Sequence, residues 1–204
     1  LMFSSAMKLQ RSSPNVKLAK RGGMSFLEIC AWPSDPVPGI NEMSQTDNRP
    51  VKTFNADSLA VRIHASEANM AADAARAVRD HLAEAIAAQG EAAAILATGN
   101  SQLQFLECLI ALDGVDWSRV ILFHMDEYLG IDANHPASFQ RYMRERVESR
   151  LNPKVFHYLG GDAPEPIAEC ERYEALLKAQ PIDLCCMGIG ENGHLAFNDP
   201  PVAD

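Results

Sequence analysis

Three short apolar runs, each followed directly by a polar loop, constrain the fold of this chain more than any other feature. The runs cover residues 93–97, 120–124 and 182–187, and helical patterns fill the sequence between them. Because parallel strands need a crossover connection, usually a helix, this alternation predicts an α/β fold with a mainly parallel sheet. In such folds ligands bind at the carboxyl ends of the strands, so the three loops are the candidate site.

The segments between the apolar runs carry the signals of helices. Apolar residues recur at a period near 3.6 from about residue 67 to 88, with Ser66 placed to cap the start and Gly90 to end it. A short strand is expected before this helix, at residues 61–63. Further helices are expected over about residues 102–112, 137–148 and 165–178.

The first 50 residues differ from the rest because no helical or strand period runs through them. They include the turn-forming run at residues 33–39, which holds three prolines and a glycine. We expect a disordered or upstream extension over residues 1–50 and one domain over residues 51–204. A start-like sequence at Met43 indicates that residues 1–42 are upstream translated sequence or part of that extension.

The composition excludes several classes of function. A net charge of -9 and a pI near 5.1 argue against a nucleic-acid binder, which needs a basic face. No apolar run approaches the length of about 18 residues that suggests a membrane span, so we expect no membrane partner. The five cysteines are odd in number and form no Cys-x-x-Cys pair, which predicts reduced thiols in a cytoplasmic protein without structural zinc. Assembly into a homo-oligomer is left open.

The first loop, Thr98-Gly-Asn-Ser101, joins an apolar run to a helix and has the parts of a phosphate cradle. Gly99 permits close approach of the backbone, Thr98 and Ser101 supply hydroxyls, and the helix start adds N–H groups and positive potential. The pattern is too short to be specific. An ordinary strand–helix turn with a capping Ser is the alternative interpretation.

The second loop places two carboxylates, Asp126 and Glu127, directly after a buried run. The electrostatic repulsion between the two carboxylates must be either tolerated by the fold or used in the function. One can point inward as a general base while the other faces a structural partner. The alternative is that both cap the next segment or face solvent.

The third loop runs from Gly188 to Asp199 and contains three glycines that bend the backbone. His194 titrates near neutrality and can accept and donate protons, and Asp199 is placed to orient it. A structural histidine at a glycine turn is the alternative. His194 has no His or Cys nearby at a metal-ligand spacing, so no metal is expected. The other five histidines are expected to pack or lie at the surface.

Taken together and in this order, the three loops resemble the glucosamine-6-phosphate deaminase/isomerase family, which is related to 6-phosphogluconolactonase. The resemblance covers roughly residue 61 to the C-terminus, and its Leu-Ala-Phe-Asn-Asp-Pro ending is similar to the deaminase branch. It rests on the segments Leu96–Ser101, Phe123–Gly130, His135–Phe139 and Asp183–Pro200. It implies a Rossmann-like fold that is incomplete at the C-terminus. Family members continue with more strands, helices and basic residues, so the resemblance implies a C-terminally truncated fragment.

The resemblance also implies a reaction without a cofactor in the carbohydrate metabolism of the cytoplasm. Glucosamine 6-phosphate would undergo ring opening, aldose–ketose isomerisation and deamination to fructose 6-phosphate plus ammonia, a step of amino-sugar catabolism. By position, Asp126 matches the base that moves the proton between C2 and C1, and His194 matches the ring-opening acid and base. Asp199 matches a Glu that supports this histidine. The residues expected to bind the substrate are Thr98, Gly99, Asn100, Ser101 and Glu127.

Two positions depart from the family pattern. Asn192, also a candidate catalytic residue, stands where the deaminases carry an Asp that aids ring opening. An amide contributes no charge and accepts no proton at neutral pH. Asp199 is one methylene shorter than the family's Glu, which reduces its reach to His194.

Two other functions stay open beside the deaminase. One is hydrolysis of a sugar-acid lactone phosphate, of the 6-phosphogluconolactonase type. The adjacent carboxylates favour the deaminase over this hydrolase, because lactone hydrolysis moves no carbon-bound proton. The other is a catalytically weak regulator that binds a sugar phosphate, which Asn192 motivates.

Overall fold

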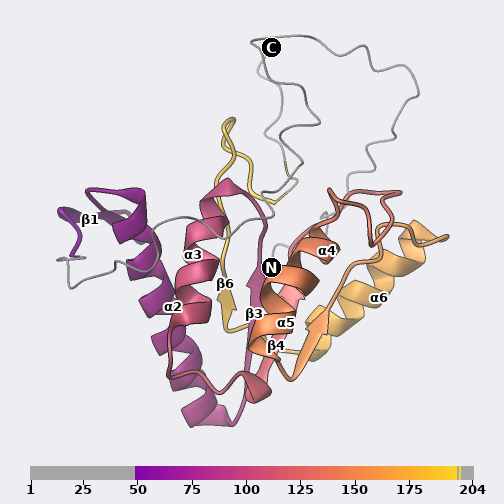
Figure 1. Ribbon diagram of the computed structural model, residues 1–204, viewed down its shortest axis with the longest axis horizontal. Coiled ribbons are helices and arrows are strands. Elements are labelled where there is room, and N and C mark those ends of the chain that lie inside the picture. Colours follow the sequence, from indigo (N-terminus) through magenta and orange to yellow (C-terminus); the bar gives the residue numbers. More distant parts are fainter. Residues whose placement is uncertain (1–48, 197, 199–204) are drawn as a thin grey trace.

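Two sheets organise the residues that the computed structural model describes, which are 49–196 and 198 (Figure 1). An antiparallel hairpin of β1 (Lys52–Ala56) and β2 (Leu59–Ile63) comes first. The second sheet has the order β5-β4-β3-β6, and each of its three strand pairs is parallel. Its strands are β3 (Ala92–Leu96), β4 (Val120–His124), β5 (Val155–His157) and β6 (Leu184–Cys185). The predicted α/β fold with a parallel sheet is confirmed.

The first helix joins the hairpin to this sheet, and the others lie between its strands in the sequence. The helices are α2 (Glu67–Gln89), α3 (Asn100–Ala111), α4 (Phe139–Met143), α5 (Ser149–Leu151) and α6 (Pro166–Ala179). A 3₁₀ turn at Trp117–Arg119 precedes β4, and a π-helical turn at Arg144–Glu148 joins α4 to α5. The predicted caps of α2 are confirmed: Ser66 accepts a hydrogen bond from Asn69 N, and Gly90 ends the helix with a left-handed φ of 89°.

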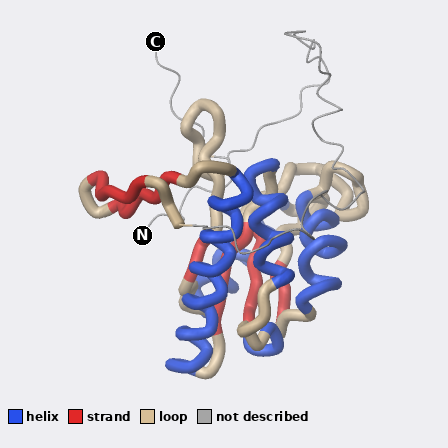
Figure 2. Tube along the Cα trace, turned by 60° about the vertical axis from the view of Figure 1, so that its left-hand side comes forward, coloured by secondary structure: helices blue, strands red, loops and turns tan. Residues whose placement is uncertain are grey.

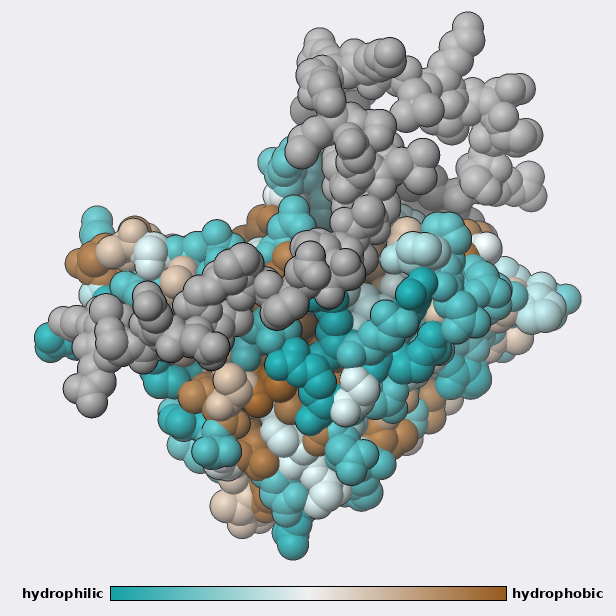
Figure 3. Space-filling view, viewed as in Figure 1, coloured by the Kyte–Doolittle hydropathy of each residue, from teal (hydrophilic) through white to brown (hydrophobic). Residues whose placement is uncertain are grey.

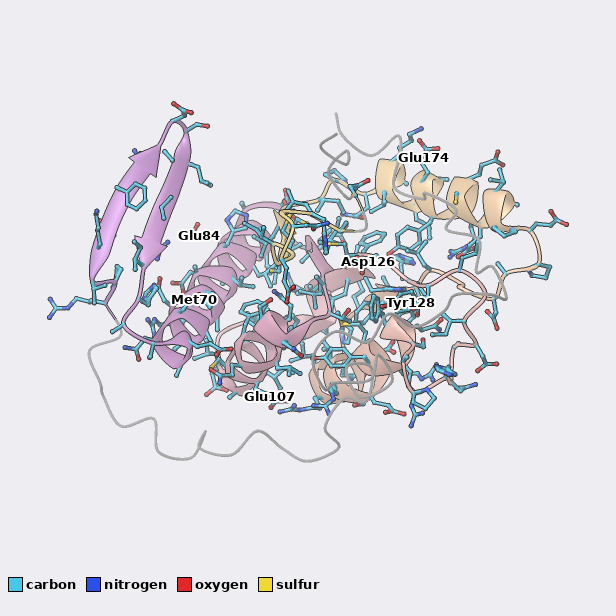
Figure 4. All side chains as sticks on the ribbon, turned by 90° about the horizontal axis from the view of Figure 1, so that it is seen from above. Met70, Glu84, Glu107, Asp126, Tyr128 and Glu174 are labelled. Carbon is cyan, nitrogen blue, oxygen red and sulfur yellow. The ribbon has the colours of Figure 1, made fainter. Side chains whose placement is uncertain are left out.

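The two central strands of the four-stranded sheet, β3 and β4, are buried on both faces. Ala92, Ala94 and Leu96 of β3 belong to a large apolar cluster with side chains of α2, α3 and the helical segment from α4 to α5. Ala93 and Ile95 point to the opposite face and pack in a second cluster, to which α6 contributes. Seen from above in Figure 4, α6 lies across the sheet from α2 and α3. Burial on both faces explains why the strands are apolar runs and do not alternate.

The hairpin stands apart from these layers (Figure 2). Every residue of β1 is exposed, and Phe54 and Leu59 keep 43% and 65% of their surface accessible. Apolar side chains are accordingly visible on the hairpin in Figure 3. It is tied to α2 at Asp73, whose carboxylate accepts a hydrogen bond from Arg62 at 2.8 Å and faces His64.

Several predicted boundaries are corrected. Helix α3 begins at Asn100, because the extended backbone breaks at Gly99 (φ 128°), so Asn100 and Ser101 lie in the helix and not in a loop. The strand expected at 182–187 is limited to the two residues of β6 that pair with β3. The helix expected over 137–148 begins at Phe139 and continues in a different winding to Leu151.

Two strands were not predicted at all. β1 pairs with β2 across a turn in which Asp57 takes a left-handed φ of 52°, and β5 has only three residues. The extension predicted over residues 1–50 lies outside the described residues, except for its last two.

Two smaller observations complete the fold. Among the described residues, no helix is both long enough and apolar enough to cross a membrane.

The cysteines that the structure describes are free thiols, and burial raises the pKa of Cys186 to about 12.

Candidate active site

Three loops leave the carboxyl ends of β3, β4 and β6 and meet at one edge of the sheet (Figure 1). We call them the central loop (residues 97–99, taken together with the first two residues of α3), the acidic loop (125–130) and the glycine loop (186–196 and 198). Because β3 pairs with β4 on one side and β6 on the other, the central loop lies between the other two. The strand order therefore brings together the three segments that the sequence singles out.

The central loop turns sharply into α3. Gly99 takes a φ of 128°, which side chains disfavour, and its carbonyl accepts a hydrogen bond from Gln102 N at 2.9 Å. The first N–H groups of α3 therefore point out of the sheet edge beside Thr98. Ser101 Oγ accepts a hydrogen bond from the buried Gln102 side chain and faces Gly188 of the glycine loop. No side chain caps this helix, so Ser101 is not the cap of an ordinary turn.

Asp126 is the partly buried acid of the site. It follows Met125, whose N–H still bonds to Leu96 O at 2.9 Å, so Asp126 lies one residue beyond the last bond of the sheet. The pKa of this carboxyl is raised to about 6, mainly by burial and next by the charge of Glu127, while the charge of His194 acts to lower it. Asp126 is thus an unusually basic carboxylate that is still ionised at neutral pH.

Glu127 takes a different direction from Asp126. Its two oxygens accept hydrogen bonds from Ser138 Oγ at 2.8 Å, from Gln140 N at 2.8 Å and from Phe139 N at 3.1 Å. All three donors lie at the beginning of α4. The sequence predicts Glu127 among the substrate-binding residues, whereas in the structure both of its oxygens are bound to α4.

His194 is held within the glycine loop. Asn192 Oδ1 accepts a hydrogen bond from the backbone N–H of His194 and lies 2.7 Å from Nδ1 of its ring. The backbone N–H of His194 can only donate, so the atom of the Asn192 side chain that it faces is the oxygen and not the nitrogen. The ring nitrogen that faces the same oxygen must then carry the hydrogen. A neutral His194 ring therefore keeps its lone pair on Nε2.

Gly190 makes room for this imidazole. A Cβ atom placed on Gly190 would overlap with the ring atoms of His194. Gly190 N also donates to His194 O, and Gly193 N donates to Gly190 O, each at 2.9 Å. Asp199, expected to orient the ring, lies outside the described residues.

The residues that support the acidic loop were not predicted from the sequence. A Cβ atom on Gly161 would lie 2.5 Å from Tyr128 O and 2.7 Å from Ile131 Cγ2, and Gly161 O accepts a hydrogen bond from Gly130 N. Ser138 is fully buried between Glu127 and Arg141 N. Ser138 belongs to the His135–Phe139 segment of the resemblance, so its position was a usable signal.

His124 is a packing residue, as expected. It is 1% exposed, and burial lowers its pKa to about 4, so it stays neutral at physiological pH. Across the described part of the chain, no group of three or more His, Cys, Asp or Glu side chains is arranged to hold a metal ion.

Comparisons with known proteins agree on one family. The family model of glucosamine-6-phosphate isomerases/6-phosphogluconolactonase matches residues 65–197. The chain is 38% identical over 136 residues to a glucosamine-6-phosphate deaminase of Exiguobacterium, with 67% of this chain and 53% of the relative covered. It is also 38% identical to glucosamine-6-phosphate deaminase 1 of Giardia intestinalis, covering 68% of this chain and 53% of that protein. The chain spans about half the length of the curated relatives it matches.

Solved structures give the same result. A monomeric glucosamine-6-phosphate deaminase superposes with a TM-score of 0.61 and 28% identity, covering 68% of this chain and 58% of that one. A 6-phosphogluconolactonase from Shewanella baltica superposes with a TM-score of 0.57 and 26% identity, covering 64% and 56%. These likenesses confirm the Rossmann-like α/β fold.

Proposed function

This chain belongs to the family of glucosamine-6-phosphate isomerases and 6-phosphogluconolactonases, and we propose that it acts on glucosamine 6-phosphate. The reaction is aldose–ketose isomerisation with deamination, in which the amino sugar phosphate and water give fructose 6-phosphate and ammonia. One observation carries the proposal: Asp126, a partly buried carboxylate of raised pKa, lies close enough to His194 for their charges to interact. Proton transfer at carbon needs such a base.

The phosphate is the part of the substrate that the central loop would hold. Its dianion fits the free N–H groups and positive end of α3, with the hydroxyls of Thr98 and Ser101 beside them. Gly99 and Asn100 complete this turn. The sugar then extends from the middle of the sheet edge toward Asp126 and His194.

Ring opening is the step that we assign to His194. Nε2 holds the lone pair of the neutral ring, so it can take the proton of the anomeric hydroxyl and return it to the ring oxygen. Asn192 keeps the ring in this tautomer without adding charge. Asp199 is proposed to support the same ring.

Isomerisation is the step that we assign to Asp126. Its carboxylate removes the proton from C2 of the open chain and delivers it to C1, after which the amine at C2 leaves as ammonia when water adds. A pKa of about 6 makes this carboxylate a stronger base than an ordinary Asp, while leaving it ionised at pH 7.

The test is to supply glucosamine 6-phosphate to the protein and measure ammonia and fructose 6-phosphate. We expect both products in equal amounts, and we expect neither from Asp126→Asn. Ammonia release that survives this substitution would show that another group moves the proton.

Lactone hydrolysis is the second candidate, because 6-phosphogluconolactonases are among the structural neighbours. His194 Nε2 could activate water for that reaction, but Asp126 would have no carbon-bound proton to move. Hydrolysis of 6-phosphogluconolactone with no ammonia from the amino sugar would favour this candidate.

A regulator with weak turnover is the third candidate, since Asn192 brings no charge to His194. Glucosamine 6-phosphate would then raise the melting temperature without being consumed. The variant Asn192→Asp separates the two cases: a gain of turnover would mean that ring opening limits the natural protein.

We further propose a cytoplasmic location, because a doubly charged sugar phosphate does not cross a membrane unaided. Cell fractionation with an antibody to the protein tests this location. Light scattering would measure whether the protein forms a homo-oligomer.

A further inference from the structure

Glu127 is bound more completely than an exposed carboxylate would be. Oε1 accepts hydrogen bonds from Tyr128 N at 3.0 Å and Phe139 N at 3.1 Å, and Oε2 accepts from Ser138 Oγ and Gln140 N, both at 2.8 Å. Four donors from two separate segments thus converge on one side chain. A carboxylate that accepts four hydrogen bonds has little capacity left for a ligand.

The rest of the acidic loop is fixed against the same neighbours. The Tyr128 ring packs on the Phe139 ring, with centroids 4.9 Å apart. On the other side of the loop, Gly161 approaches Tyr128 O so closely that no Cβ fits, and it bonds to Gly130 N at 2.6 Å. The loop that carries Asp126 is therefore held between α4 and Gly161.

The charge of Glu127 also acts on Asp126. The titratable groups around Asp126 are Glu127 in its own loop, His194 in the glycine loop, Tyr173 on α6 and the buried His124 on β4, which interacts with the backbone of Asp126. After burial itself, Glu127 contributes most to the raised pKa of Asp126, and His194 opposes it. Glu127 is thus connected to the base both by geometry and by charge.

We propose that Glu127 is a positioning residue for Asp126, which binds the start of α4 and keeps a second negative charge beside the base. This role rests on the proposed function, in which Asp126 moves the proton. Asp126 then moves the proton and Glu127 positions Asp126, and the repulsion between the two carboxylates makes Asp126 a stronger base.

Three variants separate the bonds from the charge. Glu127→Gln removes the charge and sets an NH₂ group against N–H donors that need an acceptor. Glu127→Asp keeps the charge but shortens the reach to α4. Ser138→Ala keeps the charge and removes one donor, so it is the control closest to the natural loop.

Two measurements on the protein are needed. One is the pH profile of kcat and kcat/KM for glucosamine 6-phosphate. The other is the NMR titration of the ¹³C-labelled Asp126 carboxyl, identified by its absence in Asp126→Asn, which requires no turnover. In the natural protein we expect a titration midpoint near pH 6 and an acid limb of kcat/KM at the same pH.

For Glu127→Gln we expect both midpoints to move to lower pH, because the repelling charge is gone. We also expect kcat to fall by about ten- to a hundredfold, since the loop loses its anchor, with little change in KM. Glu127→Asp should also lower kcat, but it should lower the two titration midpoints less than Glu127→Gln does. Ser138→Ala should leave the midpoint in place.

A rise in KM for Glu127→Gln, with kcat and both midpoints unchanged, would overturn the proposal and make Glu127 a substrate-binding residue. An unchanged NMR midpoint in a folded Glu127→Gln would also overturn it. Failure of the proposed function is recognised separately. In that case the NMR midpoint shifts in Glu127→Gln, but the natural protein releases no ammonia.

Discussion

The acidic loop and the glycine loop carry the two proposed proton-transfer groups, but they are built in opposite ways. The acidic loop is bound to other parts of the fold: Glu127 to the start of α4 and Gly130 to Gly161. The glycine loop is bonded to β3 at its start, where Cys186 N donates to Ile95 O, and the hydrogen bonds around His194 join residues of the loop itself, such as Gly190 to His194. The base is therefore placed by the tertiary structure, and the histidine is placed largely by local turns.

This difference predicts where substitutions act. A change at a distant contact should reach Asp126 through α4 or Gly161 and should also alter the stability of the fold. A change in the glycine loop should alter the position of His194 and leave the rest of the protein nearly unchanged.

The largest expected effect is that of Asp126→Asn. Turnover should fall by about 10²- to 10⁴-fold, because the base is lost. Above pH 6, however, Asp126→Asn should be more stable than the natural protein. The native carboxyl has a pKa of about 6 against 3.8 in the unfolded chain, so native Asp126 binds more protons between these values. Stability is therefore lost as the pH rises through this window, by up to about 3 kcal/mol, and the amide avoids that loss.

Urea unfolding at pH 8 and pH 5 measures this gain, which should be larger at pH 8. His194→Gln is the matching change in the glycine loop and should lower turnover with no such gain. If the natural protein and Asp126→Asn are equally stable at pH 8, then ionisation of Asp126 does not lower the free energy of unfolding.

The second effect is that of Gly161→Ala, which presses on the acidic loop from outside. Its new Cβ would lie 2.5 Å from Tyr128 O, so the backbone must move, at a cost of about 1–3 kcal/mol in stability. Turnover should fall with it. Gly160→Ala is the control, because its Cβ would meet only ordinary contacts from 3.4 Å. If the two variants unfold at the same urea concentration, the acidic loop does not depend on Gly161.

The smallest effect is that of Gly190→Ala, which displaces His194. Turnover should fall by roughly tenfold, while the free energy of unfolding should change by less than about 1 kcal/mol, since the loop can adjust locally. A Cβ on Gly193 would meet no atom within 4 Å, although its φ of 83° makes a side chain strained there. Gly193→Ala should thus retain more turnover than Gly190→Ala. The reverse order would contradict the assignment of Gly190 as the space for the imidazole.

Much of the fold could be predicted because its signals are local. The strand at 120–124 is an uncharged apolar run, and it forms β4 without any change of bounds. Ser66 and Gly90 mark the ends of α2 by their own hydrogen bonds. The meeting of the three loops also followed from the sequence, because parallel strands bring their carboxyl ends to one edge.

The parts that could not be predicted depend on contacts between distant residues. Glu127 and Ser138 are eleven positions apart, and only the packing of α4 brings them together. Gly161 is more than thirty residues from Tyr128, so nothing local announces their contact. β5 is too short for its own pattern, and β1 has no buried face that would create one. Asn192 and His194, in contrast, are two residues apart, and their pairing was within reach of local reasoning.

The order of the strands has a further consequence for how the site sorts its ligands. With β3 between β4 and β6, the helix start that suits a phosphate is central, and the two proton-transfer groups lie on opposite flanks. A ligand that ends at its phosphate gains only the central contacts. One with a carbon chain long enough to reach outward also meets Asp126 and His194. The order of the strands therefore selects ligands by the length of their carbon chain beyond the phosphate. It separates molecules that only bind in the site from those that can also react there.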